Sequence, residues 1–531
     1  MPKRHRLVLC AAVAAIAAAR RPGSRVVQFT KRLPRRTRRA AATVVLGGCM
    51  VGPDYEKPQV LMPDSWHVEL VDGLVPSEAQ TPGAWWIEFN DPALVELIGL
   101  AERRNLNLRS AVSTIREARA QYGVAAADLY PQVGLGADGD FSTGNQRTLT
   151  PTAGAIPGFE YENQAYSLGL DLGWEVDLWG KVRRSMQSAE ATVQETVENW
   201  RDVLVTIRAE VAQSYIAARA YQRQIAALQT TIDSRVASLM LIQERFDVGV
   251  ATELEVAQAE ANLADANAQM PMLVESLAQS FNRLSVLIGE APGPLRERLA
   301  AIRPVPRAAD EIGVGIPADI IRRRPDIRAA ERSLAAATAN IGVAEAMLYP
   351  ALKITGSGGF SSTQFSNLVD SSNLGGLLGI EVSWPFFTAG RLEALVKVSD
   401  EQAKQALYFY EQTVLNAIED VENVLISYVQ NIRAREAVAR VVRSYRNVVV
   451  LSSERYARGV DDLQTLLDAE RFLLEAEQNL AMLEGQVASS VVVLYKALGG
   501  AWDIVPQGTS GAKTIVSEEQ SEPENEQEVS G

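Results

Sequence analysis

Histidine and cysteine are almost missing from this chain of 531 residues, which has two of each. His5 lies in a leader that we expect to be removed, which leaves His67. The sequence therefore argues against catalysis that needs a histidine base and against zinc sites with histidine ligands. It also has no Gly-rich phosphate loop and no nucleophile with a histidine partner. We expect no enzyme, no catalytic residue, no metal site and no cofactor.

Acidic residues are missing from the first 48 residues, which contain twelve Lys and Arg. The rest of the chain has 40 Lys and Arg against 65 Asp and Glu. Because a body this acidic repels phosphate backbones, we exclude nucleic acid as a partner. The overall share of charged residues, 22%, is typical of a folded chain with a large core.

The N-terminal segment has the layout of a secretory signal. Residues 31–49, KRLPRRTRRAAATVVLGGC, place a basic cluster, a short apolar stretch, two glycines and a cysteine in that order. The LGGC at the end resembles a bacterial lipoprotein box. The resemblance implies removal of residues 1–48 and lipidation of Cys49; the alternative is a free cysteine in a flexible terminus. The earlier apolar stretch at 7–19 makes this leader unusually long.

Long hydrophobic runs are missing from the mature chain. No segment approaches the ~20 apolar residues of a membrane-spanning helix, so we expect any further membrane contact to use β-strands. After cleavage Cys49 has no second cysteine to pair with, which excludes an intrachain disulfide. The last segment, 506–531, is acidic and poor in apolar residues, and we expect it to be disordered.

The remaining sequence reads as two internal structural repeats. After an N-terminal arm at 49–90, repeat 1 covers 91–300 and repeat 2 covers 301–505. Each repeat begins with a helix that ends in Tyr-Pro, where the proline ring stops helix growth. Strict alternation of apolar and polar residues then predicts two strands in each repeat, with one apolar and one wet face. The four expected strands lie near 132–141, 164–178, 351–360 and 377–388.

A very long helix follows the second strand of each repeat. Residues 181–246 carry apolar or small residues at a mean spacing near the coiled-coil period of 3.5. Such a helix spans roughly 100 Å, which no compact domain requires. In both repeats a single glycine, Gly249 or Gly459, separates this helix from a second one. We expect each glycine to adopt the left-handed conformation that ends a helix, so that the two helices form an antiparallel hairpin.

The residues after each glycine predict where the second helix begins. Thr252 is a helix N-cap, and Glu255 three residues later completes a capping box. In the second repeat either Asp461 or Asp462 can serve as the cap. The corners are therefore local features of the sequence, which we expect at matching places in both repeats.

Four strands with an apolar face cannot close a barrel, because small barrels need about eight. Open strand edges are not permitted in lipid. The fold class that we expect is mixed α and β. Long antiparallel helical hairpins form an α-barrel, and the four strands of each chain contribute to a transmembrane β-barrel shared between copies. The alternative is a soluble sandwich whose apolar faces pack together.

Several motifs resemble one family in their order along the chain. They are CMVGPDYEKP at 49–58, WEVDLWGKVRRSMQSAEA at 174–191, GIPADIIRRRPDIRAAERSLAAATANIGVAEAMLYP at 315–350, and the two glycine corners. They resemble the outer-membrane factor (TolC-like) family of tripartite efflux systems, most of all its lipoprotein subgroup that serves RND pumps. The resemblance covers residues 49–505.

The resemblance implies a homotrimer with a twelve-stranded barrel in the outer membrane and a twelve-helix tunnel through the periplasm. A belt around the tunnel would include residues near 300–320 and 400–440 and the chain ends. The protein would be a lipid-anchored, passive conduit for drugs or other small toxic compounds. It would dock to a periplasmic membrane-fusion adaptor and to an inner-membrane RND pump that supplies the energy.

The resemblance also places two sites at the glycine corners. The first is the adaptor contact: Val248, Gly249, Val250, Ala251, Arg458, Gly459 and Val460. The second is a periplasmic aperture formed by Val460, Gln464 and Asp468, which we expect on one helix face. Gln464 replaces a usual leucine, which favours a more readily hydrated constriction. The alternatives are that both glycines only end helices, and that Asp468 pairs with Arg455 or Arg471.

Other functions remain open on sequence alone. The same fold could serve as the exit duct of a protein secretion system, although the lipoprotein box favours efflux. A metal exporter is less favoured, because the nine methionines form no cluster beyond Met270 and Met272. From another class, the chain could be a lipid-anchored coiled-coil scaffold without a pore.

Overall fold

The structure is a computed structural model that describes residues 50–60, 62–76, 84–145, 160–308, 311–318 and 323–500. The expected signal segment, Cys49 and the acidic tail lie outside these residues. The chain divides into two compact units, and each draws on both halves of the sequence. Of the described residues, the first unit contains 50–54, 124–145, 160–187 and 339–399. The units therefore cut across the tandem division that we expected, because strands from both halves pair in one sheet.

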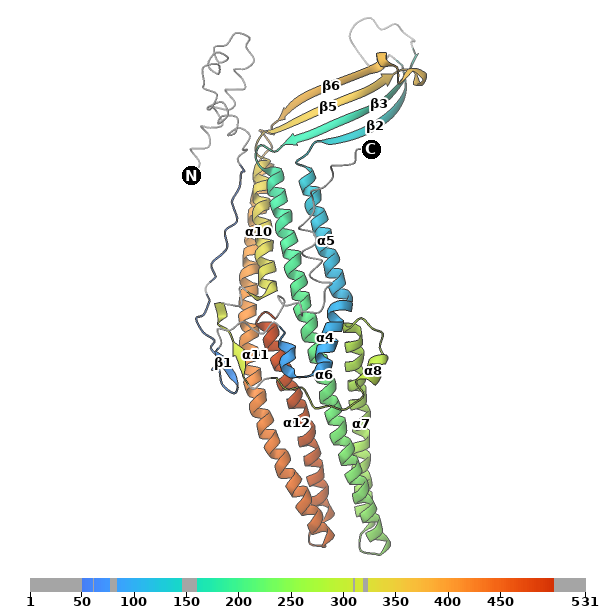
Figure 1. The fold of residues 1–531 in the computed structure, drawn as a ribbon, viewed down its shortest axis with the longest axis vertical. Helices are drawn as coiled ribbons and strands as arrows, with labels where there is room; N and C mark the ends of the chain where they lie inside the picture. Colours follow the sequence, from blue (N-terminus) through green and yellow to red (C-terminus); the bar gives the residue numbers. More distant parts are fainter. Residues whose placement is uncertain are drawn as a thin grey trace, which may run out of the picture. The chain divides into compact units, whose positions relative to one another are not determined.

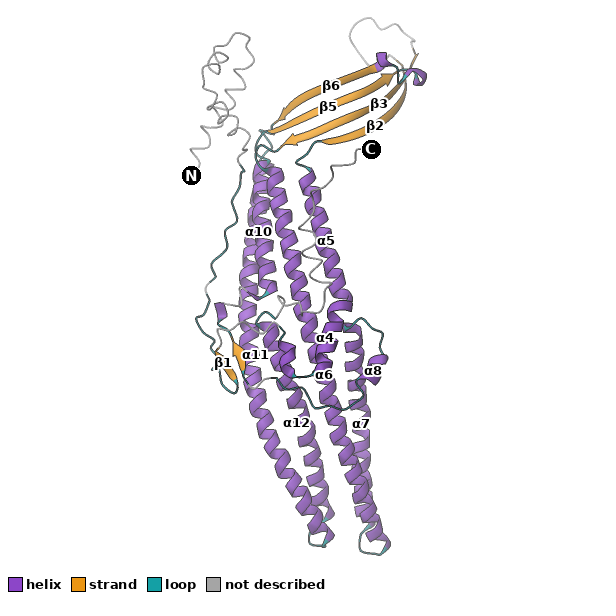
Figure 2. Ribbon diagram, in the orientation of Figure 1, coloured by secondary structure: helices purple, strands orange, loops and turns teal. Residues whose placement is uncertain are grey.

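The first unit is built on a four-stranded antiparallel sheet with the order β2-β3-β5-β6 (Figure 2). Two short 3-10 turns, η3 and η4, connect β5 to β6. Both inner strands, β3 and β5, have partners on either side, whereas β2 and β6 each keep one unpaired edge. The bounds are β2 Gln132–Asn145, β3 Glu160–Val176, β5 Ala351–Ser362, η3 Phe365–Asn367, η4 Ser371–Asn373 and β6 Leu374–Ser383.

The strand register sorts the sheet into two faces. Val133, Leu172, Gly356 and Leu378 form one row across the four strands, on the face that collects the large apolar residues. Side chains alternate along each strand, so the other face collects Asp, Glu, Ser, Thr and Gly. The period-two pattern in the sequence therefore corresponds to a real separation of apolar and polar faces.

The second unit is mainly helical (Figure 1). Helices α6 and α11 have 67 residues each, and α7 and α12 have 35 each. At 1.5 Å per residue α6 and α11 are each about 100 Å long. The helical bounds are α4 Pro92–Arg104, α5 Leu106–Ala127, α6 Lys181–Asp247, α7 Glu253–Leu287, α8 Pro294–Arg298, α10 Pro325–Ala346, α11 Arg391–Ala457 and α12 Leu463–Ala497.

A hydrophobic core in the second unit includes a segment that the sequence analysis placed in the N-terminal arm. The 3-10 helix η1 (Trp85–Phe89) buries both of its tryptophans. Trp85 stacks on Tyr495 of α12 with ring centroids 5.6 Å apart. The guanidinium of Arg208 lies 4.7 Å from the ring centroid of Trp86. Nearby, β1 (Leu74–Pro76) pairs in parallel with β4 (Ile312–Val314). Residues of the N-terminal arm are thus part of the fold.

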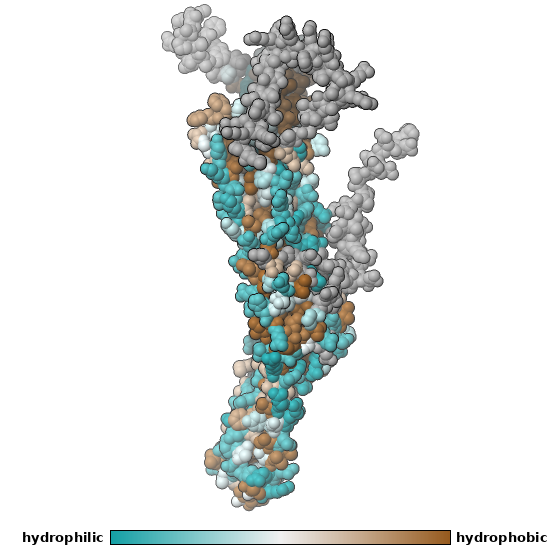
Figure 3. All heavy atoms as spheres, turned by 90° about the vertical axis from the view of Figure 1, so that its left-hand side faces the viewer, coloured by the Kyte–Doolittle hydropathy of each residue, from teal (hydrophilic) through white to brown (hydrophobic). Residues whose placement is uncertain are grey.

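One described helix, α6, is long and apolar enough over an 18-residue stretch to cross a membrane. We expected no segment of the mature chain to be long and apolar enough to span a membrane. By length and composition, α6 shows that this expectation is wrong. Only 17% of that stretch is buried. Length and composition alone do not make α6 a membrane helix, because core helices of soluble proteins meet the same criterion. Figure 3 shows hydrophobic and hydrophilic residues interspersed along the visible helical surface.

Candidate functional site

The apolar face of the sheet is exposed. Eight of its large side chains each show more than half of their surface: Val133, Leu135, Phe141, Leu170, Leu374, Leu378, Ile380 and Val382. A contiguous apolar surface of this kind marks contact with a membrane or with another protein. Two aromatic residues that follow β6, Phe386 and Phe387, are also exposed, at 84% and 80%.

The opposite face of the sheet is polar and mainly acidic. Its charged residues are Asp138, Asp140, Asp171, Glu175, Lys353 and Glu381. Lys353 on β5 is the one basic residue among them. It pairs with Glu175 on β3 at one side and with Glu381 on β6 at the other. Leu377 is the exception on this face and is 73% exposed. A surface with one apolar and one acidic side suits a wall between lipid and water.

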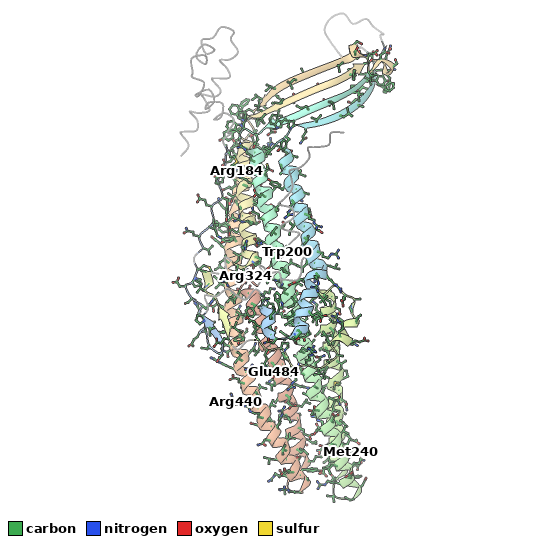
Figure 4. The ribbon with its side chains drawn as sticks, in the orientation of Figure 1. Arg184, Trp200, Met240, Arg324, Arg440 and Glu484 are labelled. Carbon is green, nitrogen blue, oxygen red and sulfur yellow. The ribbon has the colours of Figure 1, made fainter. Side chains whose placement is uncertain are left out.

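The described residues that follow Cys49 are held at the start of α6. Arg184, labelled in Figure 4, is 3% exposed. Its Nε donates to the carbonyl of Val51 at 3.0 Å and its Nη2 donates to that of Gly52 at 3.1 Å. The same Nη2 lies 2.9 Å from a carboxylate oxygen of Asp54. Residues 50–54 are thus fixed by backbone contacts as well as by charge.

Glycines make room for this segment. A Cβ on Gly180 would lie 2.7 Å from the side chain of Met50, and a Cβ on Gly52 would lie 2.4 Å from the Cα of Gly342. Gly180 also needs its positive φ of 79° at the junction of strand and helix. We call Gly180, Arg184 and Gly342 the arm seat. The motif at 174–191 contains two of its residues, Gly180 and Arg184, but sequence reasoning gave neither a role in holding the arm.

Removing the arginine should release the arm. We expect Arg184→Ala to leave the two half-buried carbonyl groups of Val51 and Gly52 without this donor and to destabilise the seated segment by about 3 kcal/mol. Hydrogen exchange of residues 50–54 in the full chain should accelerate by about a hundredfold. Arg391→Ala, which removes an exposed arginine from the first position of α11, serves as the control. Unchanged protection in Arg184→Ala would show that the seat does not hold the arm.

Both helical corners end as the sequence predicts. Gly249 and Gly459 have φ of 73° and 72°. In the first corner the N–H of Gly249 donates to the Phe246 carbonyl and that of Val250 to the Arg245 carbonyl, at 2.9 and 2.8 Å. The second corner repeats both bonds. These pairs of bonds form the Schellman motif, which satisfies the last carbonyls of a helix.

The helices after the corners begin at the expected caps. Thr252 and Glu255 form the predicted capping box at the start of α7. Of the two candidate caps in the second corner, Asp462 is the one used, and its carboxylate accepts from the Thr465 N–H at 3.0 Å. The hydrogen bonds from Thr465 lower the pKa of Asp462. Asp461 instead binds Arg455 through two contacts of 2.6 and 2.7 Å, which lower the pKa of Asp461.

The residues expected to meet an adaptor differ in exposure. Val248, Val250 and Val460 are 74%, 62% and 60% exposed, and both corner glycines have open space where a Cβ would be. Ala251 is half-buried and packs against a cluster of residues from both hairpins. The corners therefore present valines and bare backbone, while Ala251 contributes to packing inside the chain.

The two hairpins are joined near their corners by contacts that sequence reasoning missed. The guanidinium of Arg245 donates to the Tyr456 carbonyl at 3.0 Å and lies 4.8 Å from the centroid of its ring. Beneath this contact the two helical pairs share a small apolar cluster: Ile242, Ala259, Tyr456, Leu463, Leu466 and Leu467. The signal in the sequence is that Ile242 lies on the apolar stripe of residues 181–246.

A pair of buried charges lies farther along the same hairpins. Arg235 on α6 is 2% exposed and donates to the Asn262 carbonyl on α7. Glu470 on α12 is 6% exposed and accepts from the Ser238 hydroxyl of α6 at 3.3 Å. Burial raises the pKa of Glu470 and lowers the pKa of Arg235. The Ser238–Glu470 bond links the first hairpin to the second, and the Arg235–Asn262 bond joins the two helices of the first, at a depth where an unpaired charge is costly.

The three aperture residues do not share one helix face. Helix α12 begins at Leu463, so Val460 lies in the turn before it and only Gln464 and Asp468 are on the helix. The N–H of Val460 belongs to the Schellman motif that ends α11, and the cap at Asp462 comes after it, so Val460 is not part of α12. Gln464 is exposed and Asp468 is half-buried. Asp468 lies 3.0 Å from the guanidinium of Arg471, one of the two partners considered as the alternative.

No cluster of three or more His, Cys, Asp or Glu residues that could hold a metal occurs in the described parts of the chain. The features with functional potential described above are surfaces, caps and backbone. A two-faced sheet with open edges and two exposed helical corners can form walls and contacts.

Comparisons with known proteins agree with this arrangement. Residues 97–290 and 316–500 match the family described as outer membrane efflux protein. The solvent efflux pump outer membrane protein SrpC of Pseudomonas putida is 32% identical over 467 residues, which are 87% of this chain and 97% of SrpC. Nodulation protein T of Rhizobium leguminosarum bv. trifolii is 31% identical over 469 residues, with 87% and 97% covered.

Solved structures share the fold. The outer-membrane channel OprN aligns with a TM-score of 0.77 at 31% identity, over 86% of this chain and all of OprN (100%). The open state of the MtrE outer membrane channel of Neisseria gonorrhoeae aligns with a TM-score of 0.74 at 28% identity, over 86% and 99%. The mixed helical and antiparallel-sheet fold is thus that of the TolC-like channels. The chain belongs to the outer membrane efflux protein family, as its sequence motifs predict, and its function is that of an outer-membrane efflux channel.

Proposed function

We propose that three copies of this chain form one conduit that crosses the outer membrane and continues through the periplasm. The observation that carries the proposal is the four-stranded sheet, which is apolar and exposed on one face and acidic on the other. Backbone groups on its open edges need partners in lipid. Further copies of the same sheet supply those partners and turn the acidic faces toward a shared lumen.

Three copies fit better than two. Two sheets of four strands would make a barrel of eight, whose interior is filled by its own side chains. Three give twelve strands and room for an aqueous lumen. The equal lengths of α6 and α11, and of α7 and α12, support two internal repeats, so that each chain adds two similar hairpins to an α-barrel. Exposed apolar residues along α11, such as Val398, Ile426 and Leu451, would meet neighbouring copies.

A lipid on Cys49 would anchor each copy to the outer membrane. Several acyl chains bind a membrane stably, whereas one chain is marginal. Met50, the next residue, contacts Gly180 at the junction of β3 and α6 in the arm seat. The seat would therefore hold the acylated residue near the end of a lipid-facing strand, where an acyl chain can enter the membrane directly.

The corners would receive a periplasmic membrane-fusion adaptor, which joins this conduit to an inner-membrane RND pump. Exposed valines and glycines without side chains allow close approach by a partner backbone. Opening would require the second hairpin to move outward, which breaks the Arg245–Tyr456 contact and the apolar cluster beneath it. Adaptor binding would select the open state by contacting both corners.

The cargo would be drugs or other small toxic compounds. Relatives of this chain are named for solvent, toluene and antibiotic efflux. A wide, wetted tunnel selects little, so the pump would choose the cargo and supply the energy, while this chain remains a passive channel without a cofactor.

Conductance in a planar bilayer tests the proposal. The wild-type protein should give stepwise currents that favour cations, because acidic residues outnumber basic ones on the polar face of the sheet. Replacing Gln464 and Asp468 together with alanine should raise the closed-state conductance and weaken block by multivalent cations, since three Asp468 carboxylates would face one another at the aperture. Glu253→Ala, at an exposed acid on the other corner, serves as the control.

Each result has a separate meaning. A protein that passes no current at all would be a lipid-anchored scaffold, and the conduit would be ruled out. Wild-type conductance and cation block in the double variant would show that these two side chains do not gate the channel. In that case the Asp468–Arg471 contact is only a helical ion pair, as the single chain suggests.

A further inference from the structure

The sheet has two unpaired edges, on β2 and on β6. If copies of the chain form a ring, as the proposed function requires, then β6 of one copy pairs with β2 of the next. This pairing is not present in a single chain, but its register can be derived from the pairs that are. The derivation uses the correspondence between the two halves of the sequence.

The halves correspond with two fixed offsets. Residues of β2 match residues of β5 that lie 219 positions later, as Val133 matches Leu352 and Phe141 matches Phe360. Residues of β3 match residues of β6 that lie 210 positions later, as Trp174 matches Trp384 at the strand end. If the offsets are correct, then each β2–β3 pair must map onto a β5–β6 pair.

The structure meets this condition. Val133 pairs with Leu172, and the matching residues Leu352 and Val382 pair with each other. Leu135 pairs with Leu170, and their counterparts Ile354 and Ile380 also pair. At the far end Phe141 pairs with Gln164, as Phe360 does with Leu374. The same two offsets hold along the whole length of both hairpins.

The inner pairing β3–β5 can therefore be carried over to the missing outer one. Within the chain Leu172 pairs with Gly356, and Trp174 with Ile354. Adding 210 to the β3 residue and subtracting 219 from the β5 residue gives the corresponding pair. We infer that β6 of one copy pairs antiparallel with β2 of a second copy, in the register that places Val382 opposite Ala137. We call this pairing the outer seam.

Two independent features agree with this register. First, it places the apolar residues of β6 beside the apolar residues of β2, whereas a slip of one residue would join the apolar face to the acidic face. Second, it places Leu374, the first residue of β6, opposite Asn145, the last residue of β2. A slip of two residues keeps the faces but leaves one strand end without a partner.

Disulfide formation distinguishes the register from its slips. Residues directly opposite in an antiparallel pair have Cα atoms about 4.5–5.5 Å apart, within disulfide range, whereas diagonal neighbours are beyond it. Within one chain β2 and β6 are three strand spacings apart, about 14 Å, so a disulfide between them must join two copies. The chain has only two natural cysteines, at 10 and 49, neither of them in the sheet.

The experiment compares three double variants of the full chain, oxidised in detergent. Ala137→Cys with Val382→Cys matches the outer seam and should convert the monomer band to a covalent trimer on a non-reducing denaturing gel. Leu135→Cys with Val382→Cys and Gly139→Cys with Val382→Cys are slipped by two residues in either direction and should remain monomeric. The single variants Ala137→Cys and Val382→Cys control for reaction with Cys49.

Charge gives a second readout that does not depend on disulfide chemistry. On the polar face the outer seam places Glu381 opposite Asp138 of the second copy, and like charges directly opposite destabilise a strand pair. Asp138→Lys should therefore raise the dissociation temperature of the oligomer, and adding Glu381→Gln should remove the gain. Asp140→Lys faces Gly379 in this register and has Glu381 only as a diagonal neighbour, so its gain should be clearly smaller.

The outcomes separate this inference from the function it rests on. Covalent trimers from a slipped pair, or an equal gain for Asp140→Lys and Asp138→Lys, would overturn the register and leave the conduit intact. A wild-type protein that is monomeric by light scattering in detergent would overturn the trimer itself, and the outer seam with it.

Discussion

Asparagine in place of Gly249 or Gly459 is expected to leave the chain folded and to abolish efflux. Both glycines have left-handed backbone, which asparagine tolerates better than other residues. A Cβ at either position would meet nothing within 4 Å, and the Schellman bonds use only backbone atoms. The stability of the chain should therefore fall by only about 1 kcal/mol.

The effect on docking should be much larger. If an adaptor backbone approaches the bare glycine, then a side chain there blocks the central contact of the interface. Loss of a central contact weakens binding by about 2 kcal/mol or more, which is roughly thirtyfold in Kd. Titration of the adaptor against the purified channel measures this loss. Cells that depend on the variant for efflux should become as drug-sensitive as cells without the channel.

Gly390→Asn is the matched control, because Gly390 has a φ of 80° and equally open space but lies outside the corners. It should retain both folding and efflux. Wild-type efflux and adaptor affinity in the Gly249 and Gly459 variants would show that these glycines act only as helix ends, which is the simpler reading of their geometry.

Gly359→Ala is expected to prevent assembly of a stable sheet. Gly136, Gly169, Gly359 and Gly375 pair in succession and form an unbroken row of glycines across all four strands on the polar face. At the centre of the row the backbones are very close. A Cβ on Gly359 would lie 2.3 Å from the Cα of Gly169 and 2.3 Å from the Leu168 carbonyl oxygen. Glycine rows of this kind let a sheet curve toward one face.

Both clashing atoms belong to the backbone, so the contact can be relieved only by separating β3 from β5. We expect a loss of about 3 kcal/mol or more and no heat-resistant oligomer on a denaturing gel. Gly375→Ala is the control, because Gly375 is in the same row but a Cβ there would meet nothing within 4 Å. Equal behaviour of the two variants would mean that the close approach does not limit folding.

The strands and corners were predictable because their signals are local. The alternation of apolar and polar residues along 164–178 predicts the two faces of β3, whichever strands lie beside it. The capping box at Thr252 and the left-handed glycines at 249 and 459 involve residues a few positions apart. The α5 and α10 helices end at Ala127 and Ala346, a few residues before each Tyr-Pro, because turns precede the proline.

The candidate sites were predictable only in part. Position in the chain identified the exposed valines of the corners, but not that Ala251 would pack into the cluster between the hairpins. Helical spacing placed Gln464 and Asp468 on one face, but it failed for Val460, which precedes the cap. The partner of Asp468 depended on which side chains the fold brought close. Asp468 pairs with Arg471, whereas Arg455 pairs with Asp461.

By itself the sequence determined the periodicities, the helix ends and the family, since each is encoded in neighbouring residues or in motifs. Only the tertiary structure decided that β3 and β5 join the halves, that Arg184 holds residues 50–54, and that the buried Glu470 accepts a hydrogen bond from Ser238 of the other hairpin. These contacts connect residues separated by more than a hundred positions. Their formation depends on how whole elements pack, and no local pattern of residue types encodes it.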